Sequence, residues 1–415
     1  MSSFPADQPS FLHAIQSLSD AIEKTDSDES LAIFSYRECC NTSPDEVKRC
    51  RGVVVDTTTA QPLFRSLGYA AEYTDQDWPG ATLDEFASIQ FYRAEEGTLL
   101  RLFFASASRK WYLSTHRKLD ASRSRWSAGK PFGVMFEDAL FHKTGWMTTD
   151  LTSRLDPAHV YLFLVRSSPE TRIVCTGSTV PTMFHVGTIL NGQQFDLATE
   201  IAGIGRPERV AFETPHEVVE FVRTINPSHH QGVIGFYPDG RHFKVVNSQY
   251  HFLSHVRGNE PSVAFRYLQV RCHPVYSQAM FTLYPEHVPK FQQYEQIILY
   301  IAKRIHNAYI ARFVKHHNVV VSQEEYRIVR DCHGWHLTDR AKNRVTLDVV
   351  MQCLSQPKFT STLNAIIRAE LKPRKPVGAS SDVKEVTEMT EVTDVKDITE
   401  MTEMTEVTEV TEVTE

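Results

Sequence analysis

The run Gln231-Gly232-Val233-Ile234-Gly235-Phe236-Tyr237-Pro238-Asp239-Gly240-Arg241-His242-Phe243-Lys244-Val245 predicts a β-hairpin. Two apolar segments flank Pro-Asp-Gly, which favours a tight turn because proline fixes one backbone angle and glycine tolerates left-handed ones. Lys244 falls on the second predicted strand. The run therefore predicts antiparallel β-structure in this part of the chain, with one cation held on a strand.

Similar short β-rich runs recur upstream of this hairpin, whereas helical patterns are few and short there. The predicted strands are Leu31–Tyr36, Gly52–Asp56, Ile89–Tyr92, Leu99–Ala105, Trp111–Ser114, Val160–Arg166, Arg172–Thr176, Val233–Tyr237 and His242–Val246. Helices are expected at Leu83–Phe86 and Pro215–Ile225, and an amphipathic one after Ser10 that uses Phe11, Leu12, Ile15, Leu18 and Ile22. An acidic break at Asp26–Glu29 is expected to end that first helix. The first 260 residues are thus expected to form an antiparallel-rich α+β domain.

The remainder of the chain predicts a helical domain and a tail. Tyr294, Ile298, Ile301 and Ile305 belong to an apolar stripe at helical spacing, which predicts a buried helix face in a domain over 261–372. Prolines in the linker that follows block helix continuation. From Asp382 the chain is nearly a three-residue repeat with twelve acidic residues and two lysines. A period of three places the Val and Met side chains on no single face of a helix or strand. Residues 373–415 are therefore expected to be a disordered linker and tail that solubilises the protein or binds a basic protein surface.

Composition sets broad limits on the class of protein. The formal net charge of −7 arises in the tail, because the rest holds 42 basic and 39 acidic residues, a balance that decides nothing about nucleic acid. Seven cysteines without a CxxC pair favour a reducing, intracellular setting. The first residues lack the features of a signal peptide, and no apolar run approaches the roughly 20 residues that span a bilayer. A soluble intracellular protein without membrane contact is expected, in nucleus or cytoplasm.

Several segments together resemble the phage-type RNA ligase 1 family, within the covalent nucleotidyltransferases. They are Ile33-Phe34-Ser35-Tyr36, Cys50-Arg51-Gly52, Ala94-Glu95-Glu96-Gly97-Thr98-Leu99, Thr171-Arg172-Ile173-Val174 and the hairpin. The resemblance covers about Leu31 to His255. It implies a ligase-like nucleotidyltransferase domain of antiparallel sheets with flanking helices, followed by an all-α C-terminal domain.

The chain departs from that family where the resemblance implies covalent chemistry. The lysine that would attack the α-phosphorus of ATP is replaced by Ala94, whose methyl group cannot form lysyl-AMP. The strand Tyr161–Val165 lacks the family's glutamate, Gln231 stands where a glutamate would help to hold a metal, and Val246 replaces a second lysine. The neighbouring Arg93 is no substitute nucleophile because its guanidinium stays protonated.

The resemblance also identifies positions that are kept. Arg51 and Lys244 are phosphate-binding candidates, and Glu96, Gly97 and Gln231 complete the candidate nucleotide or phosphate site. Arg51 could instead be a strand-edge cation and Lys244 a solvated residue on the outer hairpin face. If the motifs are assigned correctly, Arg51, Ala94, Gln231 and Lys244 line one cleft.

A basic segment with interleaved aromatic residues follows the Ala94 motif. Between Arg101 and Lys130 there are eight basic residues against the single acid Asp120, together with Trp111, Tyr112 and Trp126. Cations and stacking rings are what a groove for single-stranded nucleic acid needs, although the same composition suits a solvated face above a core. The RNA-binding candidates are Arg109, Lys110, Trp111, Arg117, Lys118, Arg123 and Arg125.

Two main hypotheses follow for function. The leading one is a catalytically inactive RNA-ligase-like protein that binds RNA or a nucleotide as a scaffold and needs no cofactor. The other is an active ATP- and magnesium-dependent RNA ligase with a displaced nucleophile, for which Lys110 and Lys118 are the nearest strand-borne candidates. A structural or host-interaction protein that binds no nucleic acid is a third possibility. No His/Cys set has recognisable metal-site spacing, so no structural metal is expected.

Overall fold

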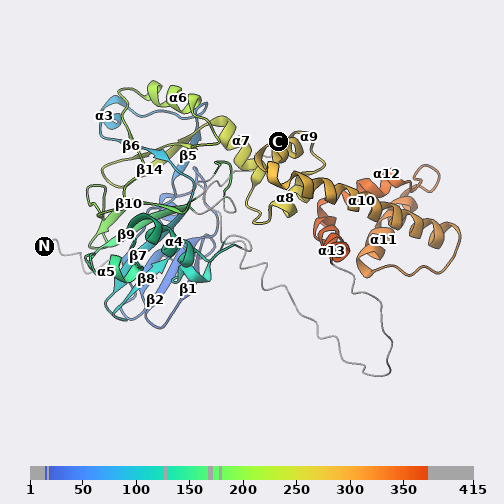
Figure 1. Cartoon of the computed structure of the whole chain (residues 1–415), viewed down its shortest axis with the longest axis horizontal. Helices are drawn as coiled ribbons and strands as arrows, with labels where there is room; N and C mark the ends of the chain where they lie inside the picture. Colours follow the sequence, from blue (N-terminus) through green and yellow to red (C-terminus); the bar gives the residue numbers. More distant parts are fainter. Residues whose placement is uncertain (1–14, 16–17, 126–128, 167–171, 177–179, 373–415) are drawn as a thin grey trace. The chain divides into compact units, whose positions relative to one another are not determined.

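The computed structural model describes residues 15, 18–125, 129–166, 172–176 and 180–372, which separate into two compact units at His255/Val256 (Figure 1). The predicted start of the first helix at Ser10, the ring of Trp126, the motif residue Thr171 and the acidic tail lie outside the described residues. Each unit is a separate fold, the first of mixed α+β structure and the second helical.

Three sheets make up the described part of the first unit. The N-terminal sheet is antiparallel in the order β1(Ile22–Ser27), β2(Leu31–Tyr36), β3(Val53–Asp56), β4(Gln61–Phe64). The central sheet is also antiparallel, in the order β11(Gln194–Asp196), β10(Thr182–Leu190), β9(Val160–Arg166), β7(Thr98–Ala105), β8(Lys110–Ser114). The hairpin sheet runs β12(Arg209–Val210), β6(Gln90–Ala94), β13(Gly232–Phe236), β14(His242–Val246), β5(Ala71–Thr74), and only its β14–β5 pair is parallel.

The predicted hairpin forms β13 and β14. Its register pairs Gly232 with Val246 and Phe236 with His242, and Gly240 takes a φ of +85° in the turn. That left-handed angle is the conformation for which glycine is suited. The strand and turn assignments of the run are therefore confirmed.

Helices cover the sheets of the first unit. They are α2(Asp45–Lys48), α3(Leu83–Phe86), α4(Phe132–Thr144), α5(Thr148–Thr152), α6(Pro215–Thr224) and α7(Ser248–Arg257). Val218 and Val222 of α6 and Phe86 of α3 pack with Val233 and Val245 of the hairpin sheet. In Figure 1, α3 and α6 lie on one side of this sheet.

The core of the first unit explains why β9 reads as a continuous apolar run. Tyr161 and Phe163 pack in a cluster with α4, whereas Val160 and Leu162 pack in a second cluster with the N-terminal sheet. A strand covered on both faces needs apolar residues at successive positions. The run therefore specifies a buried central strand.

The second unit is helical in its described part. Its helices are α8(Val263–Val270), α9(Pro274–Leu283), α10(Val288–Tyr309), α11(Gln323–Thr338), α12(Leu347–Leu354) and α13(Thr360–Leu371). The predicted stripe, Tyr294, Ile298, Ile301 and Ile305, lies buried on α10 and packs against α11 to α13. None of the helices in the described ranges combines the length and apolar character that crossing a bilayer requires.

Three sequence expectations about elements were wrong. Ile22 belongs to strand β1 and not to the first helix, and β1 extends into the acidic break as far as Ser27. No strand forms over Arg172–Thr176. The helix α4 was missed because Val134 and Phe141 remain 41% and 60% exposed, which blurs its apolar stripe.

Candidate nucleotide site

A cavity in the first unit lies between the central and hairpin sheets. Leu99, Leu164 and Val186 line it from the central sheet, and Tyr92 and Ile234 line it from the hairpin sheet. Basic side chains from several elements share the same wall. They are Arg51, Arg93, Arg166, Arg172 and Lys244. The wall thus combines an apolar part that suits a nucleobase with cations that suit phosphate.

The Ala94 motif forms the crossover from one sheet to the other. Ala94 ends β6, pairs with Gly232 of β13, lines the cavity and is 4% exposed. The chain then passes through Glu95–Gly97 into β7. A Cβ on Gly97 would lie 2.8 Å from the backbone oxygen of Val165, so this crossover has no room for a side chain. The position implied for a nucleophile is therefore buried at a tight joint in the cavity wall.

Glu96 is held by backbone amides of the protein. Its carboxylate accepts hydrogen bonds from the backbone N–H groups of Ile173, Val174 and Cys175 at 3.0, 2.8 and 2.9 Å. Successive N–H groups of a β-strand point to opposite sides, so three consecutive amides that converge on one carboxylate cannot belong to a strand. This explains why the predicted strand is absent.

Glu95 is also paired inside the protein. Its carboxylate contacts Arg166 Nη1 at 3.0 Å and His230 Nδ1 at 3.3 Å, and its side chain is 8% exposed. Arg166 is the last residue of β9, the strand that lacks the glutamate which the family resemblance implies. The carboxylate of Glu95 therefore holds the end of β9 against the crossover.

Arg51 reaches the cavity from the loop before β3. The following Gly52 has a φ of +67°, and a Cβ there would lie 2.6 Å from Nη1 of Arg101. Arg101 is fully buried and donates hydrogen bonds to the carbonyls of Gly52 and Thr115. Burial, with Arg51 nearby, lowers the pKa of Arg101 to about 9. Arg101 thus supports the Arg51 loop from inside and is no part of a surface for RNA.

Lys244 lies on the cavity side of the hairpin. Its Nζ is 3.7 Å from Oε2 of Glu72 on the neighbouring strand β5, and its side chain is 19% exposed. Burial raises the pKa of Glu72, and the positive charge of Lys244 opposes that rise. The alternative of a solvated Lys244 on the outer face is therefore wrong, because the side chain lines the cavity.

His242 adds a neutral ring to the same wall. Burial lowers its pKa to about 4, and the positive charges of Arg51 and Lys244 act in the same direction. The ring stacks on Phe236 with centroids 5.6 Å apart. At neutral pH this part of the wall therefore offers an uncharged imidazole between two cations.

Gln231 presents a buried acceptor to the cavity. It is 1% exposed, and its Oε1 has no hydrogen-bond partner among the described residues. Its backbone N–H donates to the carbonyl of Ala94 at 3.3 Å, so it lies directly beside the crossover. An unsatisfied buried amide oxygen is costly, which indicates that a donor on a bound molecule or a water completes it.

The structure brings Arg51, Ala94, Gln231 and Lys244 together on one cavity wall, as the motif assignment predicts. Glu96 and Gly97 lie on the same wall. None of the seven RNA-binding candidates in the basic segment is among the described residues that line it.

The basic segment is partly neutralised by internal contacts. Arg117 pairs with Glu23 at 2.9 Å and Arg123 with Asp26 at 3.0 Å. Trp111 packs on Phe104, with centroids 5.7 Å apart. Exposed members of the set are Arg109, Lys110, Arg123 and Arg125, whereas Arg117 and Lys118 are half-buried. The segment thus retains surface cations, and Trp111 contributes to packing.

Sequence reasoning missed Glu72, His242 and Arg166 as parts of this wall. Glu72 comes from β5, a four-residue strand without a clear apolar pattern. Alternation along the second hairpin strand is the signal that could have found His242, which lies two residues before Lys244 and thus on the same face.

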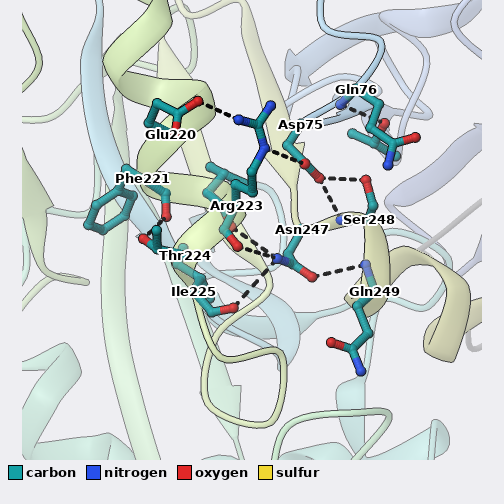
Figure 2. A network of polar contacts seen from close by, with 12 residues as sticks. Asp75, Gln76, Glu220, Phe221, Arg223, Thr224, Ile225, Asn247, Ser248 and Gln249 are labelled. Carbon is teal, nitrogen blue, oxygen red and sulfur yellow. Dashed lines mark hydrogen bonds and ion pairs between the residues drawn. The ribbon is translucent and has the colours of Figure 1, made fainter.

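A polar network fastens the hairpin to its neighbours (Figure 2). Asn247, just after β14, donates from Nδ2 to the carbonyls of Val222, Arg223 and Ile225 at the end of α6, at 3.1 to 3.5 Å. Its Oδ1 accepts the backbone N–H groups of Gln249 at 2.9 Å and Tyr250 at 3.1 Å. One side chain therefore caps the end of α6 and the start of α7, which fixes the strand that carries Lys244.

Comparisons place viral proteins and ligases among the similar proteins. The chain is 28% identical over 280 residues to the immediate-early protein ICP-46 homolog of Invertebrate iridescent virus 3, covering 65% of this chain and 61% of that protein. It is 26% identical to the homolog of Invertebrate iridescent virus 6, covering 75% and 72%. No family model matches the chain.

Solved structures similar to this chain include an archaeal ATP-dependent RNA ligase at a TM-score of 0.40 and 10% identity, covering 86% of this chain and 95% of the ligase. An RNA ligase of Naegleria gruberi has a TM-score of 0.30 and 9% identity, covering 43% and 55%. Both TM-scores are low.

Proposed function

We propose that the first unit is an RNA-ligase-like module that binds a nucleotide, or the phosphate end of an RNA, without forming a covalent enzyme–AMP. One observation carries the proposal. Ala94, at the position that the motif assigns to the nucleophilic lysine, lies on the wall of a cavity that also holds Arg51, Gln231 and Lys244. A methyl group cannot attack phosphorus, whereas the surrounding groups suit binding.

The wall chemistry matches the parts of a nucleotide. Arg51 and Lys244 suit the phosphates, since guanidinium and ammonium groups form strong charge-assisted hydrogen bonds to them. Tyr92, Leu99 and Ile234 offer an apolar surface for the base. The unsatisfied Oε1 of Gln231 suits a hydroxyl or amino donor of the ligand.

A divalent metal fits this wall poorly. Glu72 is paired with Lys244, Glu95 with Arg166, and Glu96 with three backbone amides. Magnesium prefers free carboxylate oxygens, and Gln231 offers a neutral amide in their place. No group of three or more potential metal ligands occurs in the described residues. The proposal therefore contains no step through a metal.

The displaced-nucleophile alternative is less well supported for the two lysines first considered. Lys110 and Lys118 are not among the described residues of the cavity wall. Contact with Tyr112 raises the pKa of Lys110, which makes its amine less available for attack. Lys244 is the one lysine among the described wall residues, and its amine faces Glu72.

The test measures binding and covalent labelling in the same preparation. Full-length protein is incubated with ATP labelled in its α-phosphate, with and without magnesium, then denatured and analysed for label by mass spectrometry. Non-covalent binding is measured by calorimetry with ATP and AMP. We expect saturable binding without label that survives denaturation.

Variants identify the site. Arg51→Ala and Lys244→Ala should each weaken nucleotide binding about tenfold or more, since each removes one charge-assisted contact. Lys143→Ala on the exposed end of α4 removes the same charge away from the cavity and should leave affinity unchanged. A stable adduct mapped to Lys244 or any other lysine would overturn the proposal in favour of an active ligase. Absence of nucleotide binding would also overturn it.

A further inference from the structure

The second unit contains a groove of its own, separate from the nucleotide cavity. It lies between α11 and the segment formed by α12 and the short helix Pro357–Phe359. Two contacts fix its sides. Lys358 pairs with Asp331 at 2.7 Å, and the Sγ atoms of Cys332 and Cys353 are 3.3 Å apart. The groove is therefore a built feature of the packed helices.

The α11 side of the groove is basic. Arg327, Arg330 and Gly334 are three and four residues apart, so they follow one another along one helix face, and Trp335 adjoins them. Residues Ile328, Val329 and Cys332 of the same helix point into the core. Both arginines are exposed and form no ion pair with the described residues, whereas the charge of Lys358 is balanced by Asp331. Two uncompensated cations thus face the groove.

Trp335 supplies an aromatic surface beside these cations. It is 39% exposed, which is unusual for so large an apolar ring. Asn343 Nδ2 donates to the backbone carbonyl of Trp335 at 2.9 Å, which ties the loop after α11 to the end of that helix. That loop carries the exposed cations Arg340 and Arg344.

Gly334 lines the groove at a position that carries no side chain. It lies inside a helix, where glycine costs about 1 kcal/mol relative to alanine. Its backbone is not left-handed, and a Cβ there would meet nothing within 4 Å. Neither backbone geometry nor packing within the described residues requires this glycine. The open space that it leaves lies on the groove between Arg330 and Trp335.

We propose that this groove binds single-stranded nucleic acid, with backbone phosphates on Arg327 and Arg330 and a base stacked on Trp335. The amide side chain of Gln352 on the opposite side offers both a donor and an acceptor to a base edge. Cations combined with an accessible ring are the features of single-strand sites. The acidic tail from Asp382 matches the charge but contains no aromatic residue to stack on Trp335. The inference deepens the RNA-binding part of the proposed function.

The experiment measures fluorescence anisotropy of a short labelled oligouridylate with the full chain over a range of salt concentrations. Arg327→Gln/Arg330→Gln should weaken binding at least tenfold at low salt. It should also reduce the slope of log affinity against log salt by about 1.4, because each lost phosphate contact on a single strand contributes about 0.7. Trp335→Leu should weaken binding roughly 5- to 100-fold and leave that slope unchanged, since stacking releases no counterions.

Two further variants separate the groove from general charge. Gly334→Phe fills the open space without changing charge and should weaken binding at least fivefold, with circular dichroism confirming an intact helix. Lys290→Gln/Lys303→Gln removes two exposed charges from α10 and should change affinity less than twofold. An equal loss in that control would show non-specific attraction and overturn the proposal.

Nucleotide binding to the first unit is measured in the same variants and should not change. If ATP fails to bind but the groove variants lose RNA, the cavity proposal fails while the groove proposal stands. If the oligouridylate is insensitive to all groove variants, the groove proposal fails whatever the cavity binds. The groove variants are also tested for binding of a labelled peptide of residues 382–415. If they lose affinity for this peptide but keep their affinity for RNA, the groove is assigned to the tail and the inference is overturned.

Discussion

At the scale of single residues, the proposed loss of covalent chemistry rests most directly on two side chains. Ala94 lacks the amine for attack, and Gln231, which is 1% exposed, lacks the charge to hold a metal. Both lie on the cavity wall, where their backbones are joined by a hydrogen bond. We expect either difference to weaken the first covalent step of the ligase reaction that the motif resemblance implies.

A gain-of-function test follows from this pair. Ala94→Lys supplies a nucleophile, and Gln231→Glu supplies one carboxylate, which together with the phosphates of ATP is enough to bind magnesium in many sites. We expect the double variant to acquire at least ten times more ATP-derived label than either single variant. Labelling is measured after denaturation in the presence of magnesium. Equal labelling of Ala94→Lys alone would show that the amide at Gln231 is not a barrier.

Asn247 allows a residue-scale prediction about stability. It caps α6 and α7 with one buried side chain, so Asn247→Ala leaves backbone groups at two helix ends unsatisfied. We expect the free energy of unfolding to fall by about 1–3 kcal/mol. Urea denaturation measures it, with the exposed Asn318→Ala as the control. A loss equal to that of the control would mean that water replaces both caps at no cost.

At the scale of elements, the local sequence pattern predicted those strands and helices whose backbone is not diverted by contacts with residues far away in the sequence. The apolar run of β9 and the turn residues of the hairpin are examples. The segment Arg172–Thr176 has the composition of a strand, but a carboxylate far away in sequence, that of Glu96, takes its amides. Pairings of this kind depend on tertiary contacts and not on local propensity.

The same reasoning explains how much of the candidate site was predictable. Arg51, Ala94, Gln231 and Lys244 belong to motifs that can be matched one by one, and they meet on one wall. Glu72 meets Lys244 only because β5 pairs in parallel with β14, across more than 160 residues of chain. Similarly, the pairing of Arg166 with Glu95 depends on the crossover between sheets. No local pattern indicates either contact.

Two buried strand histidines predict a pH dependence of stability. Burial lowers the pKa of His185 on β10 and of His242 on β14 to about 4, below the usual 6.5. A depressed pKa contributes stability that is fully present above pH 6.5 and lost as pH falls towards 4. For each histidine this loss is on the order of 3 kcal/mol. Urea unfolding at pH 7, 6, 5 and 4 measures it.

His185→Gln keeps a hydrogen-bonding group near Thr188 but cannot be protonated in this range. We expect this variant to lose less stability between pH 6.5 and 4 than the natural protein, by the contribution of one proton. The same slope in both proteins would mean that His185 becomes protonated without unfolding the strand.

At the scale of the whole molecule, charge is divided between the residues before Asp382 and those from Asp382 onward. The residues before Asp382 have a formal charge of +3, and the tail adds twelve acids and two lysines. Removing the tail should therefore strengthen binding of single-stranded RNA several-fold at low ionic strength. The difference should shrink as salt rises, because screening shortens the range of the tail's repulsion. Anisotropy titrations of the full chain and of residues 1–381 test this, and identical low-salt affinities would contradict it.

The hydrogen bonds from three consecutive amides to Glu96 allow hydrogen exchange to report on the crossover between the two sheets. Ile173, Val174 and Cys175 exchange their amide protons with solvent only when that carboxylate lets go. A molecule that binds beside Ala94 and stabilises the crossover should slow deuterium uptake at these three amides. A change that separates the central and hairpin sheets should accelerate it. Deuterium uptake at these three amides would thus report occupancy of the cavity without any need for turnover.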